Sequence, residues 1–241
     1  GTFLTETGDY RFLAGNRSGQ NFSMSTFNGS WAMLFEAELQ SDTLRGKFYS
    51  GVSYVSEWIA VRNPEARLRN EAALTYVVND QTVRTSDMVQ LNGKAFSLKP
   101  KEGKVVVLQI MGTWCPNCLD ESKYFIELSK QSSFKDIRFI AVGFENGNSD
   151  KDRMARLKKY QKKMGFTYPV YLGGGASTKD AHAVFNQLNG VFSFPTTIFL
   201  DKQGRIVQVN SGFDGPATGE FYKSLQEDTE RILLNLLQAD E

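Results

Sequence analysis

Residues 105–118 read VVVLQIMGTWCPNC, in which an apolar run leads directly into a Cys-x-x-Cys motif. The run, residues 105–111, contains a single polar side chain, and this pattern is typical of a buried strand. Pro116 follows the first cysteine, and proline suits the first turn of a helix because the NH group that it lacks would have no partner there. The stretch therefore predicts a strand, a turn and a helix that begins at the cysteines.

The motif supplies the only two cysteines of the chain, Cys115 and Cys118. A cysteine at the start of a helix faces the positive end of the helix dipole and unpaired backbone NH groups, which lower its pKa and favour the thiolate. Cys118 would lie one turn further into the helix, where it is shielded. We therefore expect a dithiol redox site in which Cys115 is the exposed nucleophile and Cys118 is the resolving thiol.

Two structural explanations of the motif are less favoured. A structural zinc site usually has four ligands, and the chain has no third cysteine and a single histidine, His182. A purely structural disulfide that closes so short a loop constrains the unfolded chain very little. We therefore expect no metal, and no cofactor other than a redox-active disulfide between Cys115 and Cys118.

Composition restricts the classes of partner. The 241 residues include 28 basic and 27 acidic side chains, a formal net charge of +1, so no global field attracts nucleic acid or an anionic membrane. No apolar stretch approaches the length of a membrane span. Residues 1–3 lack the pattern of a signal peptide, so either the protein is cytosolic or the sequence begins after a processing site, which the leading Gly1 favours.

The N-terminal quarter predicts β-structure. Residues 31–40 alternate between apolar and polar side chains, and turn residues recur on both sides, which indicates five or six short antiparallel strands. That number is small for a self-standing barrel or sandwich. We interpret residues 1–62 as a β-rich N-terminal domain, or part of one, and residues 63–87, with a possible short helix at 65–75, as a connector.

Residues 88–241 predict an α/β domain. Strands are expected at 104–111 and 137–144, a strand pair at 196–200 and 205–210, and helices at 116–130, 149–164, 176–188 and about 217–237. Alternation of strands and helices followed by a hairpin and a helix indicates a central mixed sheet flanked by helices.

A second motif, FPTTIFLD at residues 194–201, follows the first in the second half of the chain. Together with GTWCPNC at residues 112–118, it resembles the thioredoxin fold, and most closely the TlpA/ResA-like thiol-disulfide oxidoreductases of the bacterial cell envelope. The resemblance covers about residues 88–238 and includes, at 149–189, the extra αβ insert of that family. It implies a thioredoxin-like fold preceded by a small antiparallel β domain.

The resemblance also implies which residues meet the substrate. Pro195 would be a cis-proline that lies against the cysteines, an assignment that sequence alone could not justify because cis X-Pro bonds are a minority state. Phe194 would present its backbone to the bound substrate. The residues beside and between the cysteines, Trp114, Pro116 and Asn117, complete the predicted substrate-contacting set.

Two further positions concern proton transfer. Many thioredoxins have a buried aspartate six residues before the first cysteine, but here that position is Gln109, which cannot shuttle a proton. The TlpA/ResA-like proteins instead have a glutamate six residues after the first cysteine, which is Glu121. On a helix Glu121 shares a face with Cys118 and is a candidate proton acceptor for the buried thiol. The alternative is a solvated carboxylate stabilised by the helix dipole.

The leading functional hypothesis is a disulfide reductase of envelope proteins, located in the periplasm or cell envelope. Its partners would be protein thiol or disulfide substrates and an upstream electron donor, and it would bind no nucleic acid and have no membrane span in this chain. The N-terminal β domain would serve substrate docking or dimerisation, or be inert.

Three alternatives remain open at this point. A peroxiredoxin-like peroxidase fits poorly, because Gly112 stands where that family has threonine. A copper chaperone or cytochrome-assembly factor would use both thiols as soft ligands, and His182 matches the additional histidine of such proteins only loosely. In a third class, the β region is a binding module and the dithiol is secondary.

Overall fold

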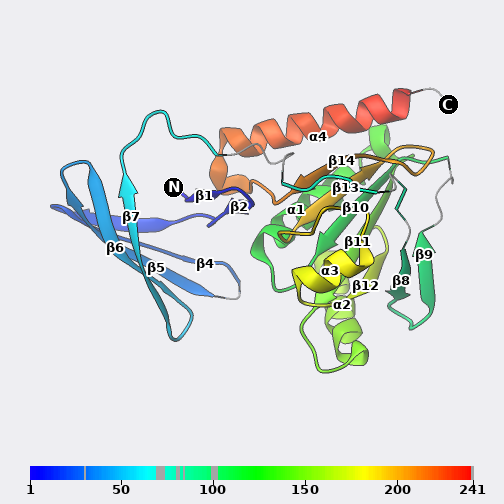
Figure 1. The fold of residues 1–241 in the computed structure, drawn as a ribbon, viewed down its shortest axis with the longest axis horizontal. Coiled ribbons are helices and arrows are strands. Elements are labelled where there is room, and N and C mark those ends of the chain that lie inside the picture. The colour runs from blue at the N-terminus through cyan, green and yellow to red at the C-terminus, as the bar shows by residue number, and fades with distance from the viewer. Residues whose placement is uncertain (30, 69–73, 80–81, 84, 99–102, 240–241) are drawn as a thin grey trace.

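The computed structural model describes residues 1–29, 31–68, 74–79, 82–83, 85–98 and 103–239. Figure 1 shows two parts, an open β-sheet formed by the N-terminal residues and an α/β part formed by the rest. A small hairpin, β1 (Leu4–Thr5) and β2 (Gly8–Asp9), lies between the two parts. None of the helices in the described ranges is both long and apolar enough to cross a membrane.

The N-terminal sheet is an antiparallel meander in which each strand pairs with the next. Its five strands are β3 (Ala14–Ser18), β4 (Asn21–Phe27), β5 (Ala32–Gln40), β6 (Thr43–Ser50) and β7 (Tyr54–Val61). The predicted alternation is confirmed on β5, where Phe35 and Ala37 are buried and Glu36 and Glu38 are exposed. A β-rich N-terminal region is therefore confirmed.

The first residues of the chain cover part of the apolar face of this sheet. The ring of Phe3 lies 4.7 Å from that of Phe35, and the ring of Tyr10 lies 5.5 Å from it. Phe35 in turn stacks on Phe48 of the neighbouring strand, with centroids 4.4 Å apart. These aromatic contacts attach the β1–β2 hairpin to the sheet.

A short helix was expected at residues 65–75 of the connector. Residues 65–68 and 74–75 are not helical, and residues 69–73 lie outside the described residues. Beyond it the chain already pairs with the α/β part. Val77 forms an isolated bridge with Leu188, and Thr82 forms one with Arg205.

The α/β part is built on a seven-stranded mixed sheet with the order β14-β13-β10-β11-β12-β8-β9. Its strands are β8 (Thr85–Gln90), β9 (Ala95–Leu98), β10 (Val106–Met111), β11 (Arg138–Glu145), β12 (Val170–Gly175), β13 (Thr196–Leu200) and β14 (Ile206–Ser211). β10, β11 and β12 are parallel, whereas β13 and β14 are antiparallel to their neighbours. The predicted mixed sheet and strand pair are confirmed.

The helices lie close to the predicted positions. They are α1 (Pro116–Leu128), α2 (Asp150–Met164), α3 (Thr178–Val184) and α4 (Glu220–Gln238), with short 3-10 helices at Ser132–Phe134 and Pro216–Thr218. α3 is shorter than expected. α4 begins later than expected because Gly219, with a φ of 64°, separates it from the preceding 3-10 helix.

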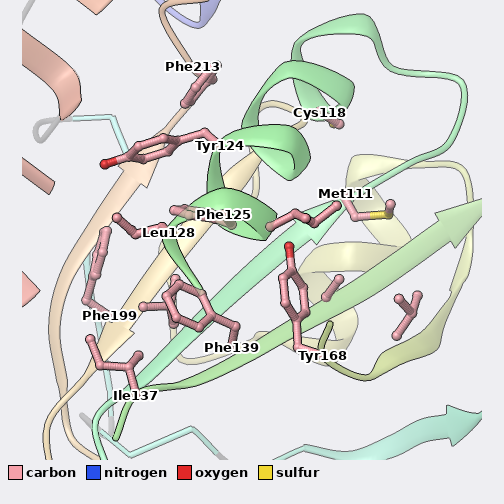
Figure 2. Packing of buried hydrophobic residues seen from close by; sticks show 14 of the residues in the cluster. Met111, Cys118, Tyr124, Phe125, Leu128, Ile137, Phe139, Tyr168, Phe199 and Phe213 are labelled. Carbon is pink, nitrogen blue, oxygen red and sulfur yellow. The ribbon is translucent and has the colours of Figure 1, made fainter. Parts of the chain in front are cut away.

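The central strand β10 is buried on both faces. Val107 and Met111 join the apolar cluster that packs against α1, α2 and α4, part of which Figure 2 shows. Val106, Leu108 and Ile110 face the opposite cluster, which includes α3. A strand covered on both sides is typical of a parallel sheet, and it places the start of α1 rigidly at the end of β10.

Candidate active site

The two cysteines lie where β10 passes into α1. Cys115 is the N-cap residue of α1, and its Sγ accepts a hydrogen bond of 3.1 Å from the backbone NH of Cys118. Pro116 occupies the first position of the helix. Cys115 and Cys118 form a disulfide with their Cα atoms 5.2 Å apart. The strand, turn and helix predicted from residues 105–118 are therefore confirmed.

Neither sulfur is widely accessible. Cys118 is fully buried, and Cys115 is only 5% exposed. The order agrees with the prediction that Cys115 is the more accessible of the two, but the expectation of an exposed cysteine is wrong.

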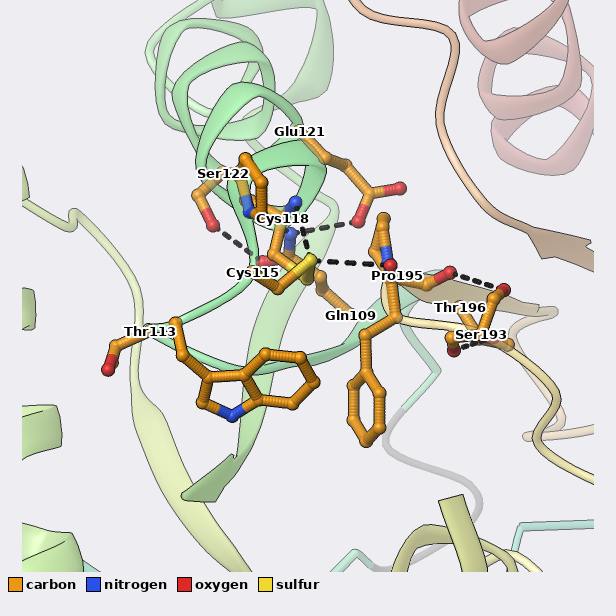
Figure 3. The surroundings of a disulfide bond; sticks show 12 residues. Gln109, Thr113, Cys115, Cys118, Glu121, Ser122, Ser193, Pro195 and Thr196 are labelled. Atoms are coloured by element: carbon orange, nitrogen blue, oxygen red, sulfur yellow. Dashed lines mark hydrogen bonds between the residues drawn. A yellow bond between two sulfur atoms is a disulfide. The ribbon is translucent and has the colours of Figure 1, made fainter. Parts of the chain in front are cut away.

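One cover comes from the loop before β13. The Phe194–Pro195 peptide bond is cis, as the resemblance implied. The carbonyl oxygen of Phe194 lies 3.3 Å from Cys115 Sγ, and Figure 3 shows Pro195 facing the disulfide. Trp114 packs edge-on against the ring of Phe194, with centroids 5.2 Å apart. These residues form one wall beside the reactive sulfur.

Trp114 is held in place by its own contacts. Its indole NH donates to the carbonyl of Phe144 at 3.0 Å. Gly112 leaves room for the indole, since a Cβ at that position would lie 2.5 Å from Trp114 Nε1. The packing of Trp114 therefore requires glycine at position 112, where the peroxiredoxin family has threonine.

Glu121 is buried, which overturns the alternative of a solvated carboxylate. It is 2% exposed, and it accepts hydrogen bonds of 2.8 Å from Gln109 Nε2 and from Thr197 Oγ1. Burial raises the pKa of Glu121 to about 8, and the two hydrogen bonds oppose this increase only in part. Glu121 is therefore a carboxyl group that can exchange a proton near neutral pH.

Gln109 connects Glu121 to the cysteine helix. Its amide nitrogen also lies 3.3 Å from the carbonyl oxygen of Cys118, and its amide oxygen accepts from Ser122 Oγ at 3.0 Å. The side chain cannot transfer a proton, as predicted, but it holds the carboxyl group of Glu121 beside the first turns of α1 (Figure 3).

Asn117 has a different environment from the one predicted. Its side-chain amide pairs with both backbone groups of Asp9, donating to the carbonyl at 3.2 Å and accepting from the NH at 3.1 Å. Gly8 makes this approach possible, because a Cβ on Gly8 would overlap the side-chain amide of Asn117. The side chain predicted to contact substrate thus holds the N-terminal segment of the same chain.

The neighbouring charged residues strengthen this attachment. The guanidinium of Arg11 lies 3.1 Å from Asp120 Oδ1 and 3.5 Å from the carbonyl of Pro116. Asp9 Oδ1 accepts from the backbone NH of Gly215 at 2.9 Å. Burial raises the pKa of Asp120, and the Arg11 and Lys123 charges lower it in part.

Sequence reasoning missed Asp9, Arg11 and Asp120. Asp9 and Arg11 lie far from the motif in sequence, and polar residues of these types are ordinarily surface groups. Glu145 was also missed: its carboxylate accepts from both the backbone NH and the hydroxyl of Thr113, at 2.5 and 2.9 Å. Burial raises the pKa of Glu145. Its position just after the apolar residues of β11 was the one available signal.

His182 is not brought to the cysteines. It lies on α3, whose buried residues belong to the cluster on the face of the sheet opposite α1. In the ranges that the structure describes, no three His, Cys, Asp or Glu side chains are grouped so that they could hold a metal ion.

Comparison with known proteins supports the site. Residues 77–224 match the Redoxin family, a range that contains both motifs and excludes the N-terminal sheet. The thiol-disulfide oxidoreductase ResA of Halalkalibacterium halodurans is 26% identical over 162 residues, which are 67% of this chain and 78% of that protein. ResA of Bacillus thuringiensis subsp. konkukian is 30% identical over 125 residues, 52% of this chain and 65% of that protein.

A solved structure of a secreted thiol-disulfide isomerase from Corynebacterium glutamicum matches 74% of this chain and 96% of that chain, with 17% identity and a TM-score of 0.49. A thiol:disulfide interchange protein from Chlorobium tepidum matches 62% of this chain and 98% of that chain, with 22% identity and a TM-score of 0.44.

The relatives confirm the resemblance to ResA-like thiol-disulfide oxidoreductases and with it the predicted class of enzyme. The predicted thioredoxin-like fold agrees with the mixed sheet, the helix that starts at the cysteines and the cis-proline beside them. Because the family match includes both motifs and more than half of the residues, the chain belongs to the Redoxin family.

Proposed function

We propose that this protein is a disulfide reductase that acts through Cys115 and Cys118. The observation that carries the proposal is the position of Cys115 Sγ at the N-cap of α1, 3.3 Å from the backbone of the cis-proline loop. A thiolate there is stabilised by the helix dipole, and a substrate sulfur can approach it along the Phe194 backbone.

The reaction is a pair of thiol-disulfide exchanges. The Cys115 thiolate attacks one sulfur of a substrate disulfide, a Cys115–substrate disulfide forms, and the other substrate sulfur leaves as a thiolate. The Cys118 thiolate then attacks Cys115 Sγ and releases the second substrate thiolate. Two electrons pass to the substrate, and the Cys115–Cys118 disulfide remains to be reduced by an upstream donor.

Glu121 accepts the proton that Cys118 must lose before the second step. A free cysteine has a pKa of about 8.5, so a carboxyl group with a pKa of about 8 is well matched to it. Glu121 lies three residues beyond Cys118 on α1, and its hydrogen bonds to Gln109 and Thr197 fix its orientation.

The names of the relatives support a partner class, because ResA is named as a thiol-disulfide oxidoreductase. We place this protein in the periplasm or cell envelope, with protein thiols or disulfides as substrates and a thiol-containing electron donor. The N-terminal β region would serve the docking of these partners or oligomerisation.

The test is a mixed-disulfide trap. In Cys118→Ser the first exchange proceeds and the second cannot, so a covalent adduct with a disulfide-bonded peptide should accumulate, whereas Cys115→Ser should give none. Mass spectrometry identifies the adduct. An adduct on Cys118 in the Cys115→Ser variant alone would reverse the two roles, and peroxide turnover faster than disulfide reduction would favour the peroxidase.

A further inference from the structure

A pocket of about 480 Å³ opens directly over the reactive cysteine. One side is lined by residues 114–117 and Phe194, and the other by Thr5, residues 7–11, Asn28 and Met33 of the β region. The N-terminal quarter of the chain, which the family match excludes, therefore supplies more than half of the residues that line the pocket around Cys115.

The position of this second wall is fixed by specific contacts. Asp9 pairs with Asn117 through its backbone and with Gly215 through its carboxylate, and Arg11 pairs with Asp120. In addition, Gly8 forms a parallel bridge with Phe213. Contacts to both α1 and the chain after β14 hold the segment as a rigid part of the site.

The wall restricts what can reach the sulfur. Cys115 is only 5% exposed, so a convex folded surface cannot present a disulfide to it, whereas a narrow chain can enter the pocket. A volume of this size holds a drug-sized ligand, which corresponds to a few residues of extended polypeptide.

The chemical character of the pocket is mainly apolar. Its two charged lining residues, Asp9 and Arg11, are already paired with groups of the α/β part. Met33, Trp114 and Phe194 are each partly exposed and offer apolar and aromatic surface. Such a lining favours uncharged side chains beside the reacting sulfur.

We propose that Met33, Thr5 and residues 7–11 form the specificity wall of the active site, which selects an extended polypeptide segment whose disulfide-bonded cysteine has apolar neighbours. The inference rests on the proposed reductase function and adds the class of substrate. Met33 is a specificity-determining residue in this scheme, and it takes no part in the exchange itself.

The experiment introduces a charge of either sign at position 33 and a charge of either sign beside the substrate cysteine. Two ten-residue peptides carry one cysteine as a mixed disulfide with 5-thio-2-nitrobenzoate, next to either lysine or glutamate. Release of the chromophore in a single turnover gives the second-order rate constant for the reduced full chain. Met33→Glu should prefer the lysine peptide and Met33→Lys the glutamate peptide. The ratio of the two rates should differ about tenfold between the variants, and less at high salt.

Met24→Glu and Met24→Lys are the matched controls. Met24 is also a partly exposed methionine of the β region, but it lies outside the pocket, so its charge should leave the peptide ratio unchanged. The rate with the neutral 2-hydroxyethyl disulfide measures the reactivity of Cys115 itself in each of the four variants. Thr7→Glu and Thr7→Lys, at another pocket position, repeat the test if the Met33 variants do not fold.

The outcomes separate the two proposals. Equal peptide ratios for the Met33 and Met24 variants, or for the Thr7 and Met24 variants, would overturn the specificity wall while the reductase function stands. A reduced wild type that reacts with neither the peptides nor 2-hydroxyethyl disulfide would overturn the reductase function itself.

Discussion

The side chain of Asn117, between the two cysteines, pairs with both backbone groups of Asp9, at 3.1 and 3.2 Å. This contact joins the N-terminal β region to the first turn of the active-site helix. The residues between the cysteines are commonly treated as determinants of redox chemistry. In this protein one of them, Asn117, also holds residues 7–11 over Cys115.

The glycine beside this contact gives the first prediction. A Cβ on Gly8 would overlap the side-chain amide of Asn117, so Gly8→Ala should displace residues 7–11 and open the pocket. Cys115 of the reduced protein should then be alkylated by iodoacetamide about threefold faster or more, because the covered state no longer predominates. Peptide mapping after timed quenching measures this rate.

Gly19→Ala is the control for backbone strain. Gly19 also has a positive φ, of 60°, but a Cβ there would meet nothing within 4 Å. Its alkylation rate should equal that of the wild type. Equal rates in the Gly8 and Gly19 variants would mean that the segment does not limit access to Cys115.

The ion pair between Arg11 and Asp120 gives the second prediction. Arg11→Met leaves the mostly buried carboxylate of Asp120 with only the more distant Lys123, so the free energy of unfolding should fall by about 2 kcal/mol. Urea denaturation measures the loss. Arg231→Met removes an exposed pair with Asp228 and should cost less than about 0.5 kcal/mol.

A double-mutant cycle with Asp120→Asn identifies the cause. If the loss comes from the unpaired carboxylate, Arg11→Met should cost much less in the Asp120→Asn background. Equal costs in both backgrounds would assign the effect to the packing of the arginine stem.

Sequence predicted the strands and helices that carry the cysteines, because β10 and α1 follow from local periodicity and from Pro116. The cis-proline followed from the resemblance alone. The contact between Asp9 and Asn117 could not be predicted, because it joins distant segments through a backbone and an ordinary polar side chain. The sequence also could not predict the burial of Glu121, because that burial depends on packing against β13, where Thr197 donates a hydrogen bond to the carboxyl group.

The third prediction concerns pH. The pKa of Glu121 is about 8 in the folded protein against an ordinary value of 4.5, so its contribution to stability is complete below pH 4.5. As the pH rises to about 8, the unfolded chain loses the proton while the folded protein retains it, and stability falls. Above the folded pKa the loss is complete.

Glu121→Gln mimics the protonated carboxyl group at every pH. Between pH 5 and pH 8, the wild type should lose on the order of 3 kcal/mol relative to this variant in urea denaturation of the oxidised protein. Glu127→Gln, an exposed position on the same helix, should follow the wild type. Parallel pH profiles for the wild type and Glu121→Gln would contradict a raised pKa.

The fourth prediction concerns the boundary between the two parts. A shortened chain of residues 63–241 retains all seven strands of the mixed sheet and the bridges from Val77 to Leu188 and from Thr82 to Arg205. We expect it to unfold cooperatively, since its apolar clusters are complete without the N-terminal sheet. Its Cys115 should be alkylated faster than in the full chain, because residues 5–11 are absent.

A still shorter chain of residues 88–241 lacks the predicted connector, residues 63–87, and so tests whether the connector belongs to the α/β domain. This chain loses both bridges, the start of β8 and the buried side chain of Val83, which is only 1% exposed. Its free energy of unfolding should therefore be lower than that of residues 63–241 by about 2 kcal/mol or more. Urea denaturation compares the two chains, and similar m-values would show that each unfolds as one unit. Equal stabilities would place the boundary at residue 88, as the sequence predicts. Loss of a cooperative transition in residues 63–241 would mean that the N-terminal sheet completes the core and that the chain is one domain.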